Sequence, residues 1–308
     1  MLDRKYLTDE VIDGYKVSAN RKKLWVTELD LLSFLEEVCI RENINYYLLF
    51  GSAIGAVRHK GFIPWDDDID LGMLREDFEK FLNADKSDWP EYIDVQYGIS
   101  EHGVDTLLRI RDARTTGITR GDLNKNGNKG AFIEIYVFDA ADNKVIRNIQ
   151  LKLTSFLERS MACYFLPSQS MNIKKKARAF LVNLIGIKRT WSLFDKVCRL
   201  QNSHKNSIYV DTPCLPNYAK TGQHLFYRAD VEKSIYVPFE YTKVRIPKGY
   251  DRCLSTRYGA YMEMPPIEKR GTHHSFEVFY DPNCPYTEYE NSPLLEQYFA
   301  GDLSLEKL

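Results

Sequence analysis

The twelve residues from Phe62 to Met73, FIPWDDDIDLGM, put four carboxylates into five positions and then return at once to apolar residues. Neighbouring like charges repel one another, and without a cation one of these acids would have to take up a proton. The run is consistent with a metal site and also with a solvated acidic turn. Any fold of this chain must therefore either solvate these acids or bring a cation to them.

Strand alternation separates the acids into two sets. Successive side chains of a strand point to opposite faces, so Asp66, Asp68 and Asp70 are expected on one face. Ile69 and Leu71 then point into the core. Asp68 and Asp70 form a pair of carboxylates at the end of a rigid element, and Mg²⁺ commonly takes one or two carboxylates plus substrate phosphates.

A third carboxylate is expected from a separate strand, AFIEIYVFD. Glu134 shares a strand face with Phe132 and Tyr136, and a charge within such an apolar run is costly unless it is paired or metal-bound. The alternative is an exposed glutamate on an edge strand. Asp67 is expected on the face opposite the metal pair.

A Gly-Ser turn precedes the acidic run and joins the apolar strand INYYLLF to a short helix, AIGAVRHK. Free backbone N–H groups and the helix dipole favour a phosphate at such a helix N-terminus. Gly51 lets the backbone approach the anion closely, and Ser52 can donate from its hydroxyl. Most Gly-Ser turns are ordinary loops, and the position directly before the acidic strand is what favours a phosphate site here.

Basic residues complete the predicted site. Arg109 and Arg111 alternate with apolar residues in LLRIRDA, so both guanidinium groups face one side of a strand and suit a pyrophosphate. Further phosphate candidates follow the Gly-Ser helix: Arg58, His59 and Lys60. The alternative for each of these residues is a solvated surface cation.

Apolar periodicity predicts an α+β (α/β) fold with a mixed β-sheet flanked by helices. The pattern changes from helical spacing to short β-rich runs and back several times before residue 140. The expected elements are a helix over 22–43, a strand over 44–50, a helix over 53–60, a strand over 68–73, a helix over 75–85, and strands over 105–113 and 130–140. Later, YVPFEYTKVRIP resembles a hairpin or an edge strand.

The middle of the chain turns helical and basic. Between Arg159 and Phe194 there is no Asp or Glu, while the segment carries an apolar run, AFLVNLIGI, between two clusters of basic residues. A basic, apolar helical segment of this kind can rest on an anionic bilayer, and the apolar part is too short to span one. The alternative is a core-packing helix with solvated lysines.

Composition and charge limit the other classes of function. The formal net charge of -1 argues against bulk nucleic-acid binding, so no nucleic-acid partner is expected. The six scattered cysteines form no CxxC pair, which favours reduced thiols over a disulfide framework, and a zinc site of Cys284 with His273 and His274 is a minor alternative. No secretory h-region or membrane-spanning apolar run is present, so we expect a cytoplasmic protein.

Taken together, these motifs resemble the LicD family of the nucleotidyltransferase-fold superfamily. The resemblance extends from about Trp25 to His274 and covers most of the chain. It is carried by LLFGSAIGAVRHKGFIPWDDDIDLGMLREDFEKF, with its Gly-Ser turn, Pro64-Trp65 and Asp68-Ile69-Asp70, and by LLRIRDARTT, FIEIYVFD, PFEYTKVRIP and YGAYMEMPP. The third acid of the family is usually aspartate, whereas this chain has Glu134, which has a longer reach.

The resemblance implies a nucleotidyltransferase-like sheet with a helical insertion and a C-terminal extension. An N-terminal extension over 1–24 then precedes a single catalytic domain over 25–274, and a C-terminal tail occupies 275–308. Within the domain, the expected parts are a core sheet over 44–140, a basic and apolar helical part over 145–201, and a strand and loop part over 235–274.

The resemblance also implies a metal-dependent phosphotransferase. Such an enzyme moves a phospho-alcohol from a CDP-linked donor, CDP-choline or similar, to a hydroxyl of a cell-surface glycan or its lipid-linked precursor, and releases CMP. Mg²⁺ (or Mn²⁺) is expected on Asp68, Asp70 and Glu134. Asp66, Asp67 and Trp65 are expected to surround these ligands, and one of the two acids can instead deprotonate the acceptor. A lipid-linked acceptor would place the protein on the inner face of the cytoplasmic membrane.

Two other readings use the same residues. A nucleotidyltransferase would attack the α-phosphorus of an NTP and release pyrophosphate, and the same carboxylates would serve it. A non-catalytic descendant of the fold would bind a glycan or a nucleotide, although all three metal positions here are carboxylates. The match beyond the acids favours the CDP-alcohol-dependent phosphotransferase.

Overall fold

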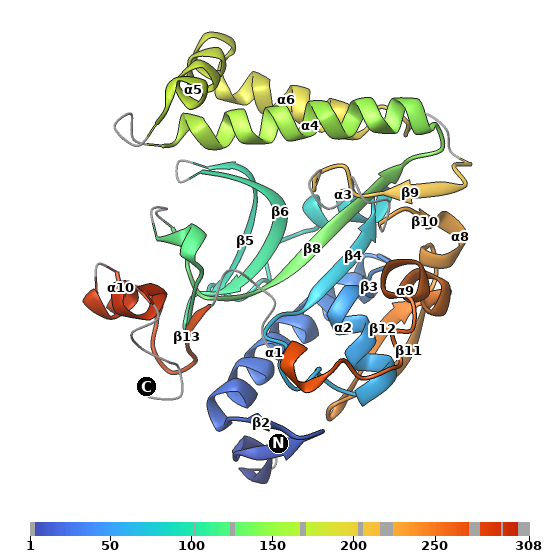
Figure 1. Cartoon of the computed structure of the whole chain (residues 1–308), viewed down its shortest axis with the longest axis vertical. Helices are drawn as coiled ribbons and strands as arrows, with labels where there is room; N and C mark the ends of the chain where they lie inside the picture. Colours follow the sequence, from blue (N-terminus) through green and yellow to red (C-terminus); the bar gives the residue numbers. More distant parts are fainter. Residues whose placement is uncertain are drawn as a thin grey trace.

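The computed structural model describes residues 4–100, 103–123, 127–166, 171–202, 206–215, 224–270, 278–290 and 292–300. Its central element is a seven-stranded mixed sheet with helices packed around it, which confirms the α+β class (Figure 1). The sheet consists of β3 (Tyr47–Leu48), β4 (Asp70–Leu74), β5 (Ile93–Ser100), β6 (Gly103–Asp112), β8 (Ala131–Ala140), β9 (Tyr209–Asp211) and β10 (Phe226–Tyr227).

Strand β8 organises the sheet because it pairs with three other strands. It runs parallel to β4 and antiparallel to β6 and β9. Its register places Glu134 opposite Asp70 of β4 and opposite Arg109 of β6. Three charged side chains from three strands therefore form one row across the sheet, while the alternate residues Ile133 and Ile135 are fully buried in the core.

Helix α1 (Ala19–Arg41) packs against β6 and β8. Its apolar residues recur at helical spacing, and Trp25, Leu29 and Leu32 are each less than 5% exposed. Ser18 caps the helix by accepting a hydrogen bond from the Arg21 backbone N–H at 3.2 Å. This long buried helix is a rigid support for the acidic loop that precedes β4.

Short helical segments surround the strands of the site. Helix α2 (Phe50–Ile54) continues into one π-helical turn, η2 (Gly55–His59), and α3 (Arg75–Leu82) follows β4. Helices α8 (Arg228–Val231) and α9 (Tyr250–Tyr258) lie next to β10, and α9 packs on α2. Arg75 of α3 and Asp139 of β8 form a buried bidentate ion pair at 2.6 and 2.8 Å, which joins α3 to the sheet.

Three helices form a separate layer at one end of the molecule, at the top of Figure 1. They are α4 (Lys144–Tyr164), α5 (Ile173–Ile185) and α6 (Ile187–Cys198). Helices α5 and α6 pack on α4, while α4 contacts β6 and α6 contacts β5. Among the described residues, no helix combines the length and the apolar character that crossing a membrane requires.

Three two-stranded ribbons complete the fold. The pairs are β1 (Glu10–Ile12) with β2 (Tyr15–Val17), β11 (Ser234–Phe239) with β12 (Thr242–Pro247), and β7 (Thr116–Ile118) with β13 (Phe279–Asp281). The remaining elements are α10 (Pro293–Ala300) and the 3-10 turns η1 (Arg4–Leu7), η3 (Arg120–Asp122), η5 (Ile267–Lys269) and η6 (Tyr286–Glu288). The predicted hairpin at 236–247 is confirmed as β11 and β12.

The structure corrects two of the predicted strands and adds one. Strand β5 was not expected, and it pairs with β6 through a register shift between Gln96 and Gly98. The strand expected over 44–50 is limited to Tyr47 and Leu48, because the chain turns into α2 at Phe50. The strand expected over 68–73 starts only at Asp70, so the preceding acids lie in a loop.

Candidate active site

The acidic loop between η2 and β4 is held in place by α1. The backbone carbonyl of Asp66 accepts hydrogen bonds from Arg21 Nη1 at 2.9 Å and from Trp25 Nε1 at 3.1 Å. The Asp66 backbone N–H donates to the carbonyl of Ile63 at 2.8 Å. The main chain at the start of the acidic run is therefore anchored on both sides, although it belongs to no strand.

The Gly-Ser turn contacts the acidic loop directly. Ser52 Oγ accepts a hydrogen bond from the Asp70 backbone N–H at 2.9 Å and donates to the Asp68 carbonyl at 3.4 Å. A Cβ atom on Gly51 would lie 2.7 Å from Asp66 Oδ2, so only glycine leaves room for that carboxylate. Ser52 is buried, and its hydroxyl therefore positions the acids instead of facing a phosphate.

A strained residue sets the direction of this turn. Phe50 has a φ of 48°, in the left-handed region that bulky residues avoid. The Phe50 ring packs on Tyr136, with the ring centroids 5.1 Å apart and the rings nearly perpendicular. These contacts stabilise the conformation, and strained backbone of this kind is common at functional sites.

The acids gather more tightly than strand alternation predicts. Carboxylate oxygens of Asp66, Asp67 and Asp68 lie within 4.8 Å of one another. The prediction that Asp67 points away from the other acids is therefore wrong, because Asp67 lies in a loop where alternation does not apply. Among the described residues this is the only group of three metal-binding side chains that lie so close to one another.

Asp70 and Glu134 form the second part of the acidic site. Arg109 donates to Glu134 Oε1 from Nε and from Nη2, both at 2.7 Å. Tyr136 donates a longer bond of 3.5 Å to Glu134 Oε2. Arg109 thus holds Glu134 in position through Oε1, while Oε2 faces Tyr136.

Burial and repulsion from neighbouring acids raise the pKa values of Asp66 and Asp70. The pKa of Asp66 lies well above its ordinary value, first because of burial and then because of Asp68 and Asp67. Burial likewise raises the pKa of Asp70, with Asp68 and Glu134 as the next causes. The cluster therefore carries more negative charge than its surroundings neutralise.

These residues fit a divalent cation. Asp66 Oδ2 and Asp70 Oδ1 are shielded from solvent and have no hydrogen-bond partner in the described part of the chain. Buried carboxylate oxygens are costly unless they are paired, and Mg²⁺ prefers oxygen ligands of this kind. The close approach of the Asp66 carboxylate to Gly51 and the raised pKa values of Asp66 and Asp70 agree with the same interpretation.

A buried acid that the motifs did not indicate lies on α1. Glu28 is 1% exposed, and its pKa lies well above the ordinary value because of burial, with Asp68, Asp67 and Asp66 as the next causes. The only sequence signal for Glu28 was its position three residues after Trp25. Residues at i and i+3 of a helix share a face, so Glu28 lies on the same face of α1 as Trp25, which contacts the acidic loop.

The acids open into a cavity of about 690 Å³, a size typical of small-molecule sites. Its walls come from distant segments: the turn at Phe50 and Gly51, the acidic loop, β8 and the segment after α9. The residues used below are Gly51, Arg58, Trp65, Asp66, Asp68, Asp70, Tyr136, Arg257, Tyr258 and Tyr261. Glu134 lies next to this cavity but does not line it.

Two arginines line the cavity, and only one of them was predicted. Arg58 Nη1 donates to the carbonyls of Tyr261 at 2.7 Å and Glu263 at 3.1 Å. The Arg257 guanidinium lies 4.1 Å from the centre of the Phe50 ring and 5.1 Å from that of Tyr258. The guanidinium groups of both arginines hydrogen-bond neutral partners among the described residues, namely backbone carbonyls for Arg58 and His224 for Arg257, so both can offer positive charge to an anionic ligand.

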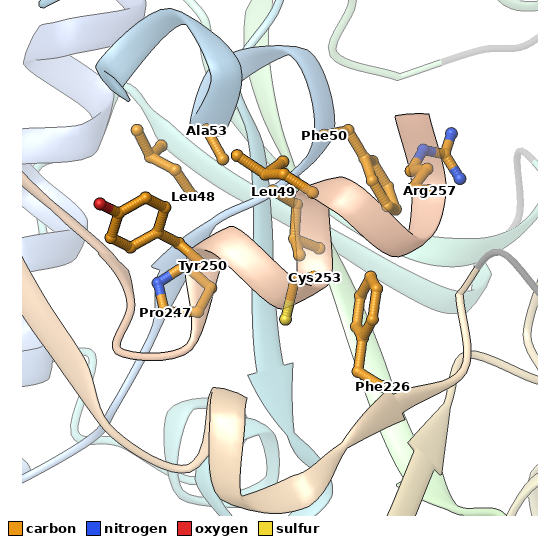
Figure 2. A pocket seen from close by; sticks show the side chains of 10 residues that line it. Leu48, Leu49, Phe50, Ala53, Phe226, Pro247, Tyr250, Cys253 and Arg257 are labelled. Atoms are coloured by element: carbon orange, nitrogen blue, oxygen red, sulfur yellow. The ribbon is translucent and has the colours of Figure 1, made fainter. Parts of the chain in front are cut away.

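A small apolar crevice positions the helix that carries Arg257. Figure 2 shows Phe50, Phe226 and Cys253 lining this crevice, with Arg257 at its edge. At about 10 Å³ it is too small for a substrate. The buried side chains around it therefore fix α9 against the turn at Phe50.

His224 contacts Arg257 and the Phe50 ring. It hydrogen-bonds Arg257 through Nε2, and its ring is 4.9 Å from the Phe50 ring. Burial and the neighbouring Arg257 lower the pKa of His224 to about 3, so the ring is neutral and accepts the bond. The motif YGAYMEMPP, which begins one residue after Arg257, was the signal that could have indicated this wall of the cavity.

Four of the cations predicted to bind phosphate do not line the cavity: Arg109, Arg111, His59 and Lys60. Arg111 is 1% exposed and donates to Gln96 Oε1 at 2.9 Å, to the Gly130 carbonyl at 2.8 Å and to Asp122 at 3.1 Å. Both it and Arg109 share the predicted strand face, but the acceptors on neighbouring strands use their donors. The prediction of Arg111 as a phosphate ligand is therefore corrected to a role in holding β6.

The other two belong to the end of η2. His59 lies 3.4 Å from Asp13 and packs edge-on against Trp65, with a side chain only 7% exposed. Lys60 has a φ of 58° and ends the turn on the surface. The π-helical turn directs both side chains away from the acids, so neither lines the cavity.

The six cysteines are free thiols, as expected. Five of them are buried, and Cys284 is partly exposed. His273 and His274, the partners of the minor zinc alternative, lie outside the described residues.

Comparison with known proteins bears on this site. Residues 43–176 match the family model described as LicD/FKTN/FKRP, nucleotidyltransferase domain. The chain is 28% identical over 274 residues to the lipopolysaccharide cholinephosphotransferase LicD of Haemophilus influenzae, across 84% of this chain and 99% of that protein. An uncharacterized protein of Rickettsia prowazekii is 37% identical over 71 residues, which is 23% of this chain and 26% of the relative. The predicted resemblance is confirmed.

Proposed function

Because residues 43–176 match the LicD/FKTN/FKRP nucleotidyltransferase family model, we propose that this chain is a transferase of phosphorus-containing groups. It moves phosphocholine, or a similar phospho-alcohol, from a CDP-linked donor to a hydroxyl of a cell-surface glycan and releases CMP. The similarity to a lipopolysaccharide cholinephosphotransferase supports this choice of reaction and makes lipopolysaccharide, or its lipid-linked precursor, the first acceptor to test.

The observation that carries the proposal is the composition of the cavity. Asp66, Asp68 and Asp70 lie on one wall, and Arg58 and Arg257 offer unpaired positive charge on others. A diphosphate needs cations around its oxygens, and a phosphoryl-transfer site needs carboxylates for a metal and for a proton. Both requirements are met within one cavity.

Each residue has a part in the proposed reaction. The acceptor hydroxyl oxygen forms a bond to the β-phosphorus, and the bond from this phosphorus to the bridging oxygen breaks, so that CMP leaves with that oxygen. Arg58 and Arg257 bind the diphosphate oxygens. Asp66 takes the proton of the hydroxyl, because its raised pKa makes it a stronger base than an ordinary carboxylate.

A divalent cation fits the remaining carboxylates. Asp68 and Asp70 would hold it, with Glu134 as the third carboxylate, and Arg109 keeps Glu134 in position. When bound, Mg²⁺ or Mn²⁺ neutralises charge on the diphosphate. Aromatic residues Trp65, Tyr258 and Tyr261 line the same cavity and offer ring faces to a quaternary ammonium group.

The proposal is tested by incubating the protein with Mg²⁺ and a panel of CDP-choline, CDP-ribitol and CDP-glycerol, and by measuring CMP. We expect CMP release from at least one donor, with a loss of about 1,000-fold in Asp68→Asn. Glu91→Gln is the matched control, because it removes one exposed carboxylate elsewhere and should leave the rate unchanged.

The nucleotidyltransferase alternative predicts a different product. If every CDP-alcohol fails while an NTP yields pyrophosphate, the phosphotransferase proposal is wrong. If neither class of donor reacts but CDP-choline binds, the chain is a binding protein of the same fold.

A further inference from the structure

The solvent face of α5 is apolar. Ile173, Phe180 and Leu184 are 86%, 66% and 72% exposed. Their spacing of seven and four residues puts them on one stripe of the helix. The residues that anchor α5, Ala179 and Val182, are buried on the opposite side. This helix therefore packs with one apolar face and leaves a second apolar face in solvent.

Helix α4 repeats this arrangement beside α5. Val145, Ile149 and Phe156 are 68%, 49% and 44% exposed and lie on one face of the helix. Arg178 of α5 lies 6.0 Å from the centre of the Phe156 ring, so the two exposed surfaces adjoin. Isolated exposed apolar residues are ordinary, but a contiguous apolar patch of this extent marks an interaction surface.

The charges on α5 have one sign. The segment 159–194 contains seven basic residues and no acidic residue, in a chain whose formal net charge is -1. Lys174 and Lys176 flank the α5 stripe and are exposed, as is Lys188 at the start of α6. The nearest acids lie outside α5: the exposed Asp142 before α4 accepts the backbone N–H groups of Ile208 and Tyr209, Glu158 is partly buried in α4, and Asp195 faces Arg75 and Arg199.

We propose that the outer face of α4 and α5, named the basic-apolar face, docks on the surface of a bilayer containing anionic phospholipids. Interfacial helices combine an apolar stripe with flanking Lys and Arg in this way, with the apolar side chains among the acyl chains and the cations at the headgroups. Helices α4 and α5 belong to the layer at one end of the molecule (Figure 1). This docking goes beyond the proposed transferase activity, since it requires no substrate.

The charge favours a bilayer over a second copy of the chain. A symmetric dimer through this face would bring the same patch of each copy together, and with it two sets of like charges. An anionic lipid surface complements the cations and accommodates the apolar stripe. We therefore expect binding that needs both features and that weakens as salt screens the charges.

The test is sedimentation of the full chain with vesicles of phosphatidylcholine alone or with 30% (about one lipid in three) phosphatidylglycerol. The wild-type protein should bind the anionic vesicles and not the neutral ones. Removing three cations in Lys174→Gln/Lys176→Gln/Lys188→Gln should lower the partition coefficient roughly 100-fold, since each basic residue near an anionic surface contributes about fivefold. Phe180→Ser/Leu184→Ser should abolish binding at the same net charge.

Matched controls separate this effect from a general loss of charge or fold. Lys233→Gln/Lys243→Gln/Lys248→Gln removes three exposed lysines from the β11–β12 hairpin and should leave vesicle binding unchanged. All variants should keep the circular dichroism spectrum of the wild type. Equal binding of wild type and Phe180→Ser/Leu184→Ser, or no wild-type binding, overturns the proposal. A dimer in light scattering that Phe180→Ser/Leu184→Ser dissociates, without vesicle binding, shows that a second copy covers the face.

Discussion

At the scale of single residues, the close approach of Gly51 to Asp66 is the most restrictive contact of the site. A methyl group at Gly51 would lie 2.7 Å from Asp66 Oδ2, so the carboxylate would have to move. A displacement of about 1 Å near a reacting group can cost 100-fold in rate. We expect Gly51→Ala to lower kcat/KM by 10- to 100-fold while the melting temperature changes little.

The control for this substitution is Gly121→Ala. A Cβ at Gly121 meets only Thr119 Oγ1 at 3.6 Å, an ordinary contact. This variant should keep the wild-type rate, measured as CMP release. A Gly51→Ala enzyme of full activity would show that Asp66 has no fixed position in the reaction.

Arg111, which is buried in the sheet, and Arg257, which lines the cavity, offer a second test. Arg111 is enclosed by acceptors on neighbouring strands, so Arg111→Gln should lower the free energy of unfolding by about 3 kcal/mol. Arg257 lines the cavity, so Arg257→Gln should raise KM for the CDP-linked donor about tenfold, the effect of losing roughly one charge-assisted hydrogen bond. Urea titration and steady-state kinetics measure the two effects.

An effect of Arg111→Gln on substrate binding instead of stability would contradict these assignments. If Arg111→Gln raised KM at unchanged stability, Arg111 would contact the substrate, as its sequence pattern first indicated. The assignment of the phosphate site to Arg257 would then be wrong.

Repulsion among the acids predicts a response to metal. Asp70 has a raised pKa and a carboxylate oxygen without a hydrogen-bond partner among the described residues. Mg²⁺ should therefore raise the melting temperature of the wild type, because a ligand that binds the folded state stabilises it. Asp70→Asn removes one of the repelling charges, so it should melt higher than wild type in EDTA and respond less to Mg²⁺. A wild-type melting temperature that is independent of Mg²⁺ and Mn²⁺ would contradict a metal site here.

At the scale of elements, α4 contains a titratable group poised near neutral pH. Burial raises the pKa of Glu158 from 4.5 to about 7, with Arg159 opposing the shift. The folded state thus disfavours the charged form. Its stability relative to the unfolded chain is highest below pH 4.5 and falls as the pH rises to about 7.

Glu158→Gln removes this dependence. The variant should gain stability over wild type as the pH rises from 5 to 8, by about 1–2 kcal/mol after allowance for the partial exposure of the side chain. Urea unfolding at pH 5 and pH 8 measures the difference, with the exposed Glu91→Gln as a comparison. A constant difference between wild type and Glu158→Gln at the two pH values would show that Glu158 is ionised normally.

Strand alternation predicted some elements and failed at others for definable reasons. It placed Glu134 and Arg109 on one face of the sheet and Leu71 in the core, because β4, β6 and β8 are regular. It misplaced Asp67, because the strand begins only at Asp70 and the loop before it follows the hydrogen bonds of α1. The alternation of side chains holds only within a strand, so it does not predict the direction of side chains in a loop.

The cations of the site were harder to predict than the acids. A pattern indicates that two arginines share a face, but not that Gln96, Asp122 and a backbone carbonyl use the donors of Arg111. These acceptors come from separate segments of the chain. Arg257 was missed for the same reason, because only the packing of α9 on α2 brings it to the cavity.

At the scale of the whole molecule, the cavity exists only when distant segments assemble. Helix α1 anchors the acidic loop, β4 and β8 place the carboxylates, and the segment after α9 closes the opposite wall. Residues 43–176, which match the family model, contain the acids, whereas Arg257 and Tyr258 lie beyond them. The acids thus belong to the part shared with the family model, and one wall of the cavity comes from a later part of the chain.

The C-terminal segment is integrated into the same body. Strand β13 pairs with β7, and Phe279 packs with Ile118 of that strand and with Leu295 and Tyr298 of α10. Thr116 of β7 also donates to the Cys284 carbonyl at 2.7 Å. Residues 278–290 and 292–300 therefore support the turn that follows β6, the strand that carries Arg109.

The central claim is that this cavity transfers a phospho-alcohol from a CDP-linked donor. The most direct measurement uses CDP-choline labelled in the choline, a lipopolysaccharide acceptor lacking phosphocholine, and Mg²⁺, with CMP and labelled glycan quantified together. We predict equal amounts of both products, reduced at least 100-fold in Asp70→Asn, because loss of a metal ligand should exceed the effect of about 10- to 100-fold that loss of an outer-shell partner causes. No label on the glycan and no CMP, together with pyrophosphate from an NTP under the same conditions, would contradict the claim.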